Sequence, residues 1–449
     1  MKPNLGVKGT NKSLFVPLKT KDLGDMQQIE RYTAEAVELL KGMVAIPSPS
    51  FSEEAVCSHI SGWMHERGID HERVGNNIIA EHIVDPSKPT LMLCAHIDTV
   101  APSPDYDFDP YKPDYKQAAE FISQAIGRAV TPEEIVPGLG SNDDGASAVT
   151  MLAVYRYFLE NHGDGSGVTN DPSHFIGAGP TPCGQGGSTV YDTTAISTDG
   201  TIISDRDIVT AETRLNANVR NIILVLTCEE ERSGKDGMTG LWGARLREKV
   251  DYAIVGEPTC MKAATAERGL LVIDATAHGI SGHAARNEGK NALYIALEDI
   301  DRLRKHEFSR ISPRMGKVNL NVTQINAGTA HNVIPDCCTF VIDIRPTEQY
   351  TNEEILQELQ EICESELKPR NLSNRSSATW EDSPLQKAAD KLGIETFSSP
   401  TTSDWMRITC DAVKMGPGDS SRSHRKNEFV LIEEISTSIE EYIKFISLV

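Results

Sequence analysis

The chain has 449 residues, of which 39% are hydrophobic and 24% charged, and its 44 basic and 65 acidic residues give it a formal charge of −21. This acidic balance argues against a protein that wraps nucleic acid or lies on anionic lipid. The longest apolar runs, such as Leu91 to Ala95 and Ile222 to Leu226, are far shorter than the ~18 residues that a membrane-spanning helix needs. A chain of this length is expected to form roughly two to three domain-sized units.

The N-terminus and the cysteines indicate the cellular setting. Residues 1–25 carry five lysines and no continuous apolar core, which predicts a tail and neither a secretory signal nor a transit peptide. Nine cysteines are spread along the chain without the spacing of a metal finger. They favour reduced thiols and a cytoplasmic protein over structural disulfides.

Helical and extended patterns then alternate along the chain. Apolar residues at helical spacing predict helices over 29–43, 53–67 and 144–159, and short apolar runs predict strands over 77–81, 90–95, 221–227 and 252–255. Continuous apolar strands between helices are typical of an α/β domain with a mostly parallel sheet covered on both faces. We assign residues 26–267 and 377–449 to this domain. Residues 163–218, rich in Gly, Ser, Thr and Asp, favour a flexible surface insertion, and a flap over the substrate is the alternative.

The pattern changes over residues 268–376. The spacing there predicts a strand at 270–277, a helix at 291–308, strands at 317–325 and 338–345, a helix at 352–367 and a last short strand at 370–376. The order βαββαβ is the ferredoxin-like, split-βαβ arrangement. Because α/β patterns resume after Trp380, we interpret this α+β unit as a lid domain inserted into the first domain.

Five short polar motifs stand at predicted strand ends or in glycine-rich loops. They contain His96 with Asp98, Asp143 with Asp144, the triplet Glu229 to Glu231, Glu257, and His424. Each one alone has an ordinary explanation, such as a helix cap at Asp143 or an exposed acidic loop at the triplet. Open α/β sheets, however, build their sites at the carboxyl ends of their strands.

Together these motifs predict a metal centre. His96, Asp143, Glu231, Glu257 and His424 supply two imidazoles and three carboxylates. If one carboxylate is shared, each of two metal ions receives one His, one Glu and the bridging Asp, with positions left for water and substrate. Mixed nitrogen and oxygen ligands with open positions suit zinc or cobalt in hydrolysis.

The order of the motifs resembles that of the dinuclear zinc amidohydrolases and peptidases, a family that includes acetylornithine deacetylase, succinyl-diaminopimelate desuccinylase, carboxypeptidase G and the aminoacylases. The resemblance covers residues 29–449 apart from the 163–218 insertion and implies a zinc-exopeptidase-like catalytic domain. It also implies that Asp143 bridges the metals, with His96 and Glu257 at one ion and Glu231 and His424 at the other.

The resemblance assigns two further roles beside the metals. Asp98 would steady His96, and Glu230 would be the general base that takes a proton from the attacking water. Two assignments stay open. The base and the metal ligand could instead be Glu229 and Glu230, and the bridging aspartate could be Asp144 in place of Asp143.

The lid also resembles that of the family. By this resemblance His283 helps to polarise the scissile carbonyl, often in the neighbouring subunit, while Arg345 and Asn332 bind the substrate carboxylate. A homodimer formed through the lid follows from it. The segment 105–137 appears as an extra loop relative to the family.

Among subfamilies, the motifs Ser403-Asp404 and Met415 to His424 look most like the acetylornithine deacetylase group. The expected reaction is hydrolysis of N2-acetyl-ornithine or N2-succinyl-ornithine to ornithine and a carboxylate, as in arginine biosynthesis. Succinyl-diaminopimelate desuccinylase, a dipeptidase and a carboxypeptidase are the alternatives within the family. A metal-free binding relative is the alternative from another class.

Overall fold

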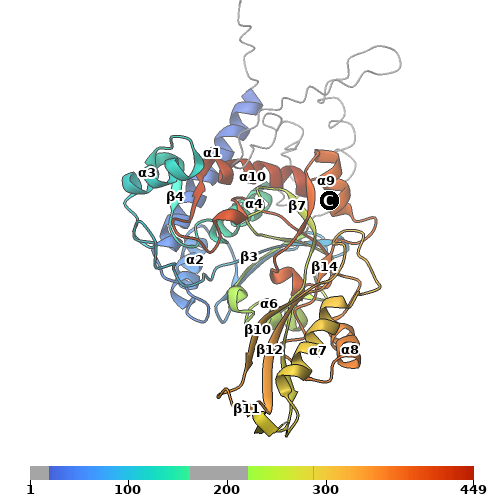
Figure 1. Ribbon diagram of the computed structural model, residues 1–449. Coiled ribbons are helices and arrows are strands. Elements are labelled where there is room, and N and C mark those ends of the chain that lie inside the picture. The colour runs from blue at the N-terminus through green and yellow to red at the C-terminus, as the bar shows by residue number, and fades with distance from the viewer. Residues whose placement is uncertain (1–19, 162–220, 287) are drawn as a thin grey trace, which may run out of the picture.

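The computed structural model describes residues 20–161, 221–286 and 288–449. Figure 1 shows a larger body that carries the long helices and a smaller lid that projects from it. The predicted insertion 163–218 and residues 1–19 of the predicted tail lie outside the described residues. The other part of the predicted tail belongs to the first helix, which begins at Thr20 and not near Asp25.

The body is built on one large mixed sheet. Its strands are β1 (Glu72–Val74), β2 (Asn77–His82), β3 (Thr90–His96), β5 (Asn221–Thr227), β6 (Tyr252–Val255), β7 (Ala263–Glu267), β14 (Ser377–Ala378), β15 (Thr396–Ser399) and β16 (Asp411–Lys414). They lie in the order β1-β2-β5-β3-β6-β16-β7-β14, and β15 pairs with β7. The central strands β5, β3, β6 and β16 run parallel, and the sheet becomes antiparallel beyond them. The predicted α/β class is confirmed.

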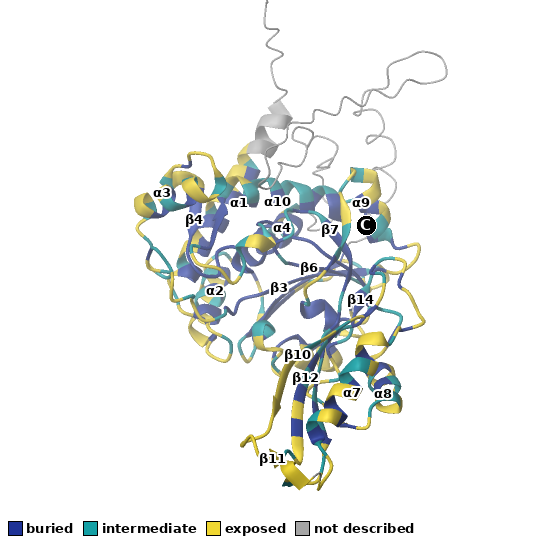
Figure 2. Ribbon diagram, in the orientation of Figure 1, coloured by how far each residue is buried: buried dark blue, intermediate teal, exposed yellow. Residues whose placement is uncertain are grey.

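Helices cover both faces of this sheet. They are α1 (Thr20–Val44), α2 (Glu54–Glu66), α4 (Gly145–Asn161), α6 (Met238–Leu241), α9 (Pro384–Leu392) and α10 (Ile432–Ile446). Successive side chains of β3 point to opposite faces of the sheet and pack into two different hydrophobic cores. Leu91 and Leu93 pack with α1, α2, α4 and α10, whereas Met92 and Cys94 pack with α6 and Trp405 on the other face. Burial on two faces explains why the sequence of β3 is continuously apolar, and Figure 2 shows its strand buried throughout.

The segment 105–137 is not a plain loop, which corrects the sequence interpretation. It holds α3 (Tyr115–Ile126) and β4 (Ile135–Pro137), and β4 pairs with β17 (Phe429–Leu431). Asp114 caps α3, since its carboxylate accepts hydrogen bonds from the backbone N–H groups of the first turn. The small core under α3 includes Phe429, so its formation depends on residues about 300 positions away in the chain.

The lid has the predicted βαββαβ order. Its elements are β8 (Leu271–His278), α7 (Ala292–Lys305), β10 (Asn319–Ala327), β12 (Cys337–Arg345), α8 (Asn352–Ile362) and β13 (Glu366–Pro369), with a short ribbon of β9 (Gly282–His283) and β11 (Val333–Ile334). The four-stranded antiparallel sheet has the order β10-β12-β8-β13.

The bounds of the last helix and the last strand of the lid were predicted wrongly. The second helix ends at Ile362 and not at residue 367, and the last strand is Glu366–Pro369 and not 370–376. The fully buried carboxylate of Asp299, on α7, accepts hydrogen bonds from the backbone N–H groups of Glu364 and Ser365. This contact from another element turns the chain, so the local pattern could not reveal it.

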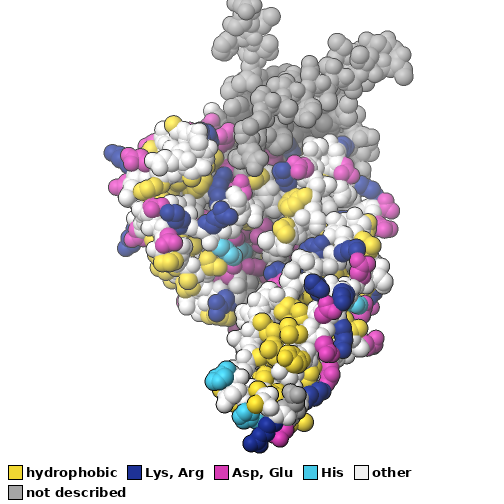
Figure 3. Space-filling view, viewed as in Figure 1, with side chains coloured by type: hydrophobic (Ala, Val, Ile, Leu, Met, Phe, Trp, Pro, Cys, Tyr) yellow, Lys and Arg dark blue, Asp and Glu magenta, His cyan; other side chains and the backbone are white. Residues whose placement is uncertain are grey.

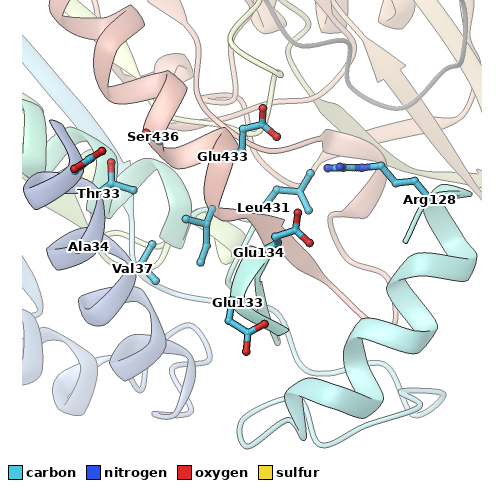
Figure 4. Close-up of a pocket in the computed structure, with 11 residues that line it drawn as sticks. Thr33, Ala34, Val37, Arg128, Glu133, Glu134, Leu431, Glu433 and Ser436 are labelled. Carbon is cyan, nitrogen blue, oxygen red and sulfur yellow. The ribbon is translucent and has the colours of Figure 1, made fainter. Parts of the chain in front are cut away.

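A groove of about 460 Å³ lies between α1, the 3-10 turn Pro132–Glu134 and the start of α10, with Val37 and Leu431 among its apolar lining (Figure 4). None of the candidate metal ligands lines it.

Across the described residues, no helix combines the length and the apolar character that a bilayer crossing requires. The eight cysteines within the described ranges are all free thiols, as predicted.

Candidate active site

Three neighbouring parallel strands bring the first candidate residues together. His96 is the last residue of β3, the acidic triplet follows β5, and Glu257 follows β6. In the sheet His96 pairs with Thr227 and Cys94 pairs with Val255, so these strands end at the same edge. The structure therefore brings these residues together at one edge of the sheet, as their positions at strand ends predicted.

A pocket of about 190 Å³ opens at this edge. Its lining comprises His96, Asp143, Glu230, Glu231, Glu257 and His424, together with the hydroxyl-bearing residues Thr401, Thr402, Ser420 and Ser423. The structure therefore brings all five predicted metal ligands and the predicted base to one cavity. The larger groove of Figure 4 is lined by glutamates and Arg128 but by no histidine, so chemistry and not size identifies the candidate site.

Asp143 lies between the two histidines of the pocket. Its Oδ1 is 3.3 Å from His96 Nε2, and its Oδ2 is 3.7 Å from His424 Nε2. His424 Nε2 is also 2.9 Å from Glu231 Oε1. A carboxylate that turns one oxygen toward each imidazole has the arrangement required of a ligand shared by two cations.

Two overlapping groups of ligand atoms fit single cations. His96, Glu230 and Glu257 form one group, and His96, Asp143 and Glu231 form the other, each with its atoms within 4.8 Å of one another. Each of these two groups of three residues is compact enough to hold one metal ion. Glu230, predicted as a base, thus lies close enough to His96 and Glu257 to contact an ion or the water on it.

Asp98 joins His96 to the acidic triplet. Its Oδ1 is 3.4 Å from His96 Nδ1, and its backbone oxygen is 3.0 Å from the same nitrogen. Its carboxylate also accepts hydrogen bonds from the backbone N–H groups of Glu230 and Glu231, at 3.1 and 3.2 Å. Burial is the largest single influence and pushes the pKa of Asp98 up, but the hydrogen bond and charge of His96, together with hydrogen bonds from Ser50 and the Glu231 backbone, outweigh it, so the pKa is lowered. One ionised carboxylate therefore orients both the imidazole and the acidic loop.

The Glu229 side chain is turned away from the pocket. Its carboxylate accepts a hydrogen bond from the backbone N–H of Asp236 and closes the loop that follows β5. Gly234 packs so closely on this side chain that a Cβ there would lie 1.9 Å from Glu229 Oε2. Glu230 and Glu231, in contrast, both line the pocket.

The electrostatics of the site favour a bound cation. Burial raises the pKa of Glu230 and of Glu257 well above the usual range, and neighbouring carboxylates such as Asp404 and Asp143 raise them further. The hydrogen bond to Glu231 raises the pKa of His424 to about 9. Without a cation, burial and the repulsion of neighbouring carboxylates favour the protonated forms of Glu230 and Glu257. The donor set therefore fits divalent metal ions.

Two further buried carboxylates support the site, and the sequence assigned no role to either. Glu428 is 2% exposed and accepts hydrogen bonds from the backbone N–H groups of Asn142 and Asp143, at 3.0 and 2.9 Å. Asp404 accepts a hydrogen bond from the Thr227 hydroxyl at 2.7 Å, at the end of β5. Asp404 lies within the Ser403-Asp404 motif and Glu428 comes shortly after His424, but the residues that these two carboxylates bind are distant in the chain.

The predicted lid residues do not line this pocket. His283 and Asn332 lie together on the exposed β9–β11 ribbon, where the Asn332 carbonyl accepts a hydrogen bond from Ala284. Both Nε and an Nη of Arg345 donate to the carboxylate of Asp343, at 2.9 and 3.2 Å. In this conformation of a single chain, the guanidinium is paired within the lid.

Comparison with known proteins identifies the lid. Residues 265–371, which span the lid sheet and both of its helices, match the peptidase dimerisation domain of the M20 family. This part of the chain therefore resembles a peptidase dimerisation domain. Two curated proteins match part of the chain. The chain is 28% identical over 234 residues to an acetylornithine deacetylase from Myxococcus xanthus, covering 48% of the chain and 61% of that protein. It is 32% identical over 149 residues to a succinyl-diaminopimelate desuccinylase from Cereibacter sphaeroides, covering 31% of the chain and 39% of that protein.

The matched regions span less than two thirds of the length of these curated relatives. Solved structures share the fold over more of the chain. An M20 family metallo-carboxypeptidase from Sulfolobus solfataricus has a TM-score of 0.59 at 14% identity, covering 92% of this chain and 98% of its own. Aminopeptidase PepT from Bacillus cereus has a TM-score of 0.60 at 16% identity, covering 94% and 98%.

Proposed function

We propose that this chain is a metal-dependent hydrolase of the M20 type that cleaves the amide bond of an N-acylated amino acid. The observation that carries the proposal is the position of Asp143, which has one carboxylate oxygen 3.3 Å from His96 Nε2 and the other 3.7 Å from His424 Nε2 in the same pocket. A structural aspartate at the start of α4 would need no such pair of imidazoles.

In this proposal two divalent cations, zinc first and cobalt as an alternative, occupy the pocket. By the family resemblance, Asp143 would be shared, His96 and Glu257 would complete one position, and Glu231 and His424 would complete the other; all five residues line the pocket. Metal ions bound there would polarise the amide carbonyl and lower the pKa of water at neutral pH.

Glu230 is the proposed general base. It lines the pocket beside the ligands, and its raised pKa suits a group that accepts a proton from water and returns it to the departing amine. The hydroxyl groups of Thr401, Thr402, Ser420 and Ser423 offer neutral hydrogen-bond donors along the rest of the lining, where the substrate would lie.

For the substrate we propose N2-acetyl-ornithine or N2-succinyl-ornithine, with ornithine as the product and arginine biosynthesis in the cytoplasm as the setting. The similarity to an acetylornithine deacetylase over 48% of the chain supports this choice. Similarity to a desuccinylase supports succinyl-diaminopimelate as the second candidate.

A substrate panel tests the proposal. Purified protein loaded with zinc or with cobalt is assayed for amine release from N-acetyl-ornithine, N-succinyl-ornithine, N-succinyl-diaminopimelate and a dipeptide, beside a Glu230→Ala control. We expect the highest kcat/KM for an ornithine derivative and background rates in the control. A higher kcat/KM for succinyl-diaminopimelate or the dipeptide would replace the proposed substrate, and no hydrolysis by metal-loaded protein would reject the hydrolase.

We further propose that the chain forms a homodimer through the lid. The dimerisation domain match supports it, as do the exposed apolar side chains Ile280, Tyr294, Leu297 and Ile325 of the lid. Figure 3 shows apolar side chains grouped on the lid surface. In the dimer His283, on the outer ribbon, would reach the partner's pocket, and Arg345 and Asn332 would bind substrate carboxylate. Exposed apolar groups of this kind commonly mark contact surfaces.

A further inference from the structure

A buried carboxylate outside the pocket holds the start of the acidic triplet. Glu53 is completely buried at the start of α2, and its Oε1 accepts hydrogen bonds from two backbone N–H groups, that of Phe51 at 2.7 Å and that of Glu229 at 3.2 Å. Its Oε2 accepts a third hydrogen bond from the Asn76 side chain at 3.2 Å.

The two N–H groups that donate to Oε1 belong to residues whose backbone has a positive φ, in the left-handed region of the Ramachandran plot. Phe51 has φ 74° and Glu229 has φ 62°. Residues with a Cβ rarely adopt this conformation unless the surroundings hold them there. A single oxygen atom thus fixes two strained turns, one in the loop before α2 and one directly after β5.

The conformation of Glu229 determines where the next two side chains lie. Asp98 holds the N–H groups of Glu230 and Glu231, so three consecutive N–H groups of the triplet are bound by buried carboxylates. If Glu229 left the left-handed region, the chain direction after β5 would change. Glu230 and Glu231 would then no longer face the pocket together.

We propose that Glu53 is a positioning residue for the metal centre. It acts through the backbone of Glu229 and sets the orientation of Glu231, the proposed ligand, and Glu230, the proposed base. The inference rests on the proposed function, because it assigns Glu53 a role toward the proposed metal ions. Supporting groups around a metal site commonly change metal affinity about 10- to 100-fold when removed.

The neighbouring residue provides a matched control. Glu54 is the next position in the chain, but its side chain is 71% exposed and binds Arg73 and Ser58 on the surface. Glu53→Ala, Glu53→Gln and Glu54→Ala are compared with the parent protein. Each metal-free protein is titrated with zinc by calorimetry and with cobalt by visible absorption, which reports the coordination geometry, and circular dichroism monitors the fold.

We expect Glu53→Ala to bind the metals at least about tenfold more weakly and to shift the cobalt spectrum. Glu53→Gln keeps a side-chain oxygen that accepts both N–H groups once the Asn76 amide rotates, so it should retain affinity within about threefold. Glu54→Ala should match the parent. A folded Glu53→Ala variant with parental affinity and spectrum would overturn the proposal.

A second comparison covers the case in which Glu53→Ala does not fold. Glu53→Asp is then decisive, because it keeps the carboxylate but is one methylene too short to reach both N–H groups: at least about tenfold weaker metal binding in the folded Asp variant supports the role, and parental affinity and spectrum contradict it. If the parent protein itself binds no metal, the proposed function fails. If the parent binds metal and the variants do not differ, only the role of Glu53 fails.

Discussion

His424 Nε2 lies 2.9 Å from Glu231 Oε1, although 193 positions separate the two residues in the chain. This contact joins the loop after β16 to the loop after β5 and raises the pKa of His424 to about 9. At neutral pH the metal-free imidazole is therefore protonated. A metal ion that binds there must displace that proton.

Metal affinity should consequently increase with pH. A ligand of raised pKa holds its proton below that pKa, so each displaced proton makes the apparent affinity rise about tenfold per pH unit. We expect a slope of at least about one between pH 6 and 9, because the pKa values of His96 and Glu257, two further proposed ligands, are raised as well. Calorimetric titrations in buffers of different ionisation enthalpy count the protons released. His283→Ala should keep the slope, whereas an affinity independent of pH would contradict the protonated state of His424.

The register of the acidic triplet can be tested by substitution. Glu230→Ala should keep its metal, measured by elemental analysis after desalting, yet lose turnover by about 100-fold or more, because a general base typically contributes that much. Glu231→Ala should lose metal. Glu229→Gln is the matched control, since an amide oxygen can still accept the Asp236 N–H. Loss of metal from the Glu230 variant, with retention in the Glu231 variant, would show that the register is wrong.

Glu428 should make the metal-free protein less stable as pH rises. Burial raises its pKa from an ordinary 4.5 to about 8, so folding favours the protonated form. This stabilising contribution is complete below pH 4.5 and is lost as pH increases through 8. The slope for one such proton is on the order of 1 kcal/mol per pH unit.

Glu428→Gln isolates this effect, because the amide stays neutral and its oxygen can still accept the N–H groups of Asn142 and Asp143. Without metal, the Tm of the Gln variant relative to the parent should rise between pH 5 and 8. A Tm difference that stays constant over this range would contradict the raised pKa.

Subunit exchange tests whether the active site draws residues from two chains. Glu230→Ala and His283→Ala proteins, each inactive alone, are mixed under exchanging conditions. If His283 acts in the partner's pocket, half of the dimers are hybrids and each hybrid has one intact site, so about a quarter of all sites recover. A mixture of Glu230→Ala and Glu231→Ala is the control and should stay inactive, because both defects belong to the same pocket. Exchange without recovery in the first mixture would remove His283 from the partner's site.

Much of the site could be predicted because its signals are local. A strand buried on two faces is continuously apolar, as in β3 and β5, and the first polar residues after it mark the end of the strand. Parallel strands end at one edge, so His96 and the acidic triplet could be expected near each other from the sequence alone. The same reasoning explains why the βαββαβ order of the lid was recognised while its last boundary was not.

The tertiary structure decided which groups hold those residues in place. The acceptor for the Asp143 N–H, Glu428, is 285 positions away, and the acceptor for the Glu229 N–H, Glu53, is 176 positions away. Buried N–H groups need a hydrogen-bond partner, but any acceptor that the fold brings within reach can satisfy them. Sequence spacing therefore indicates the candidate ligands, and only the packing of distant segments determines the carboxylates that orient them.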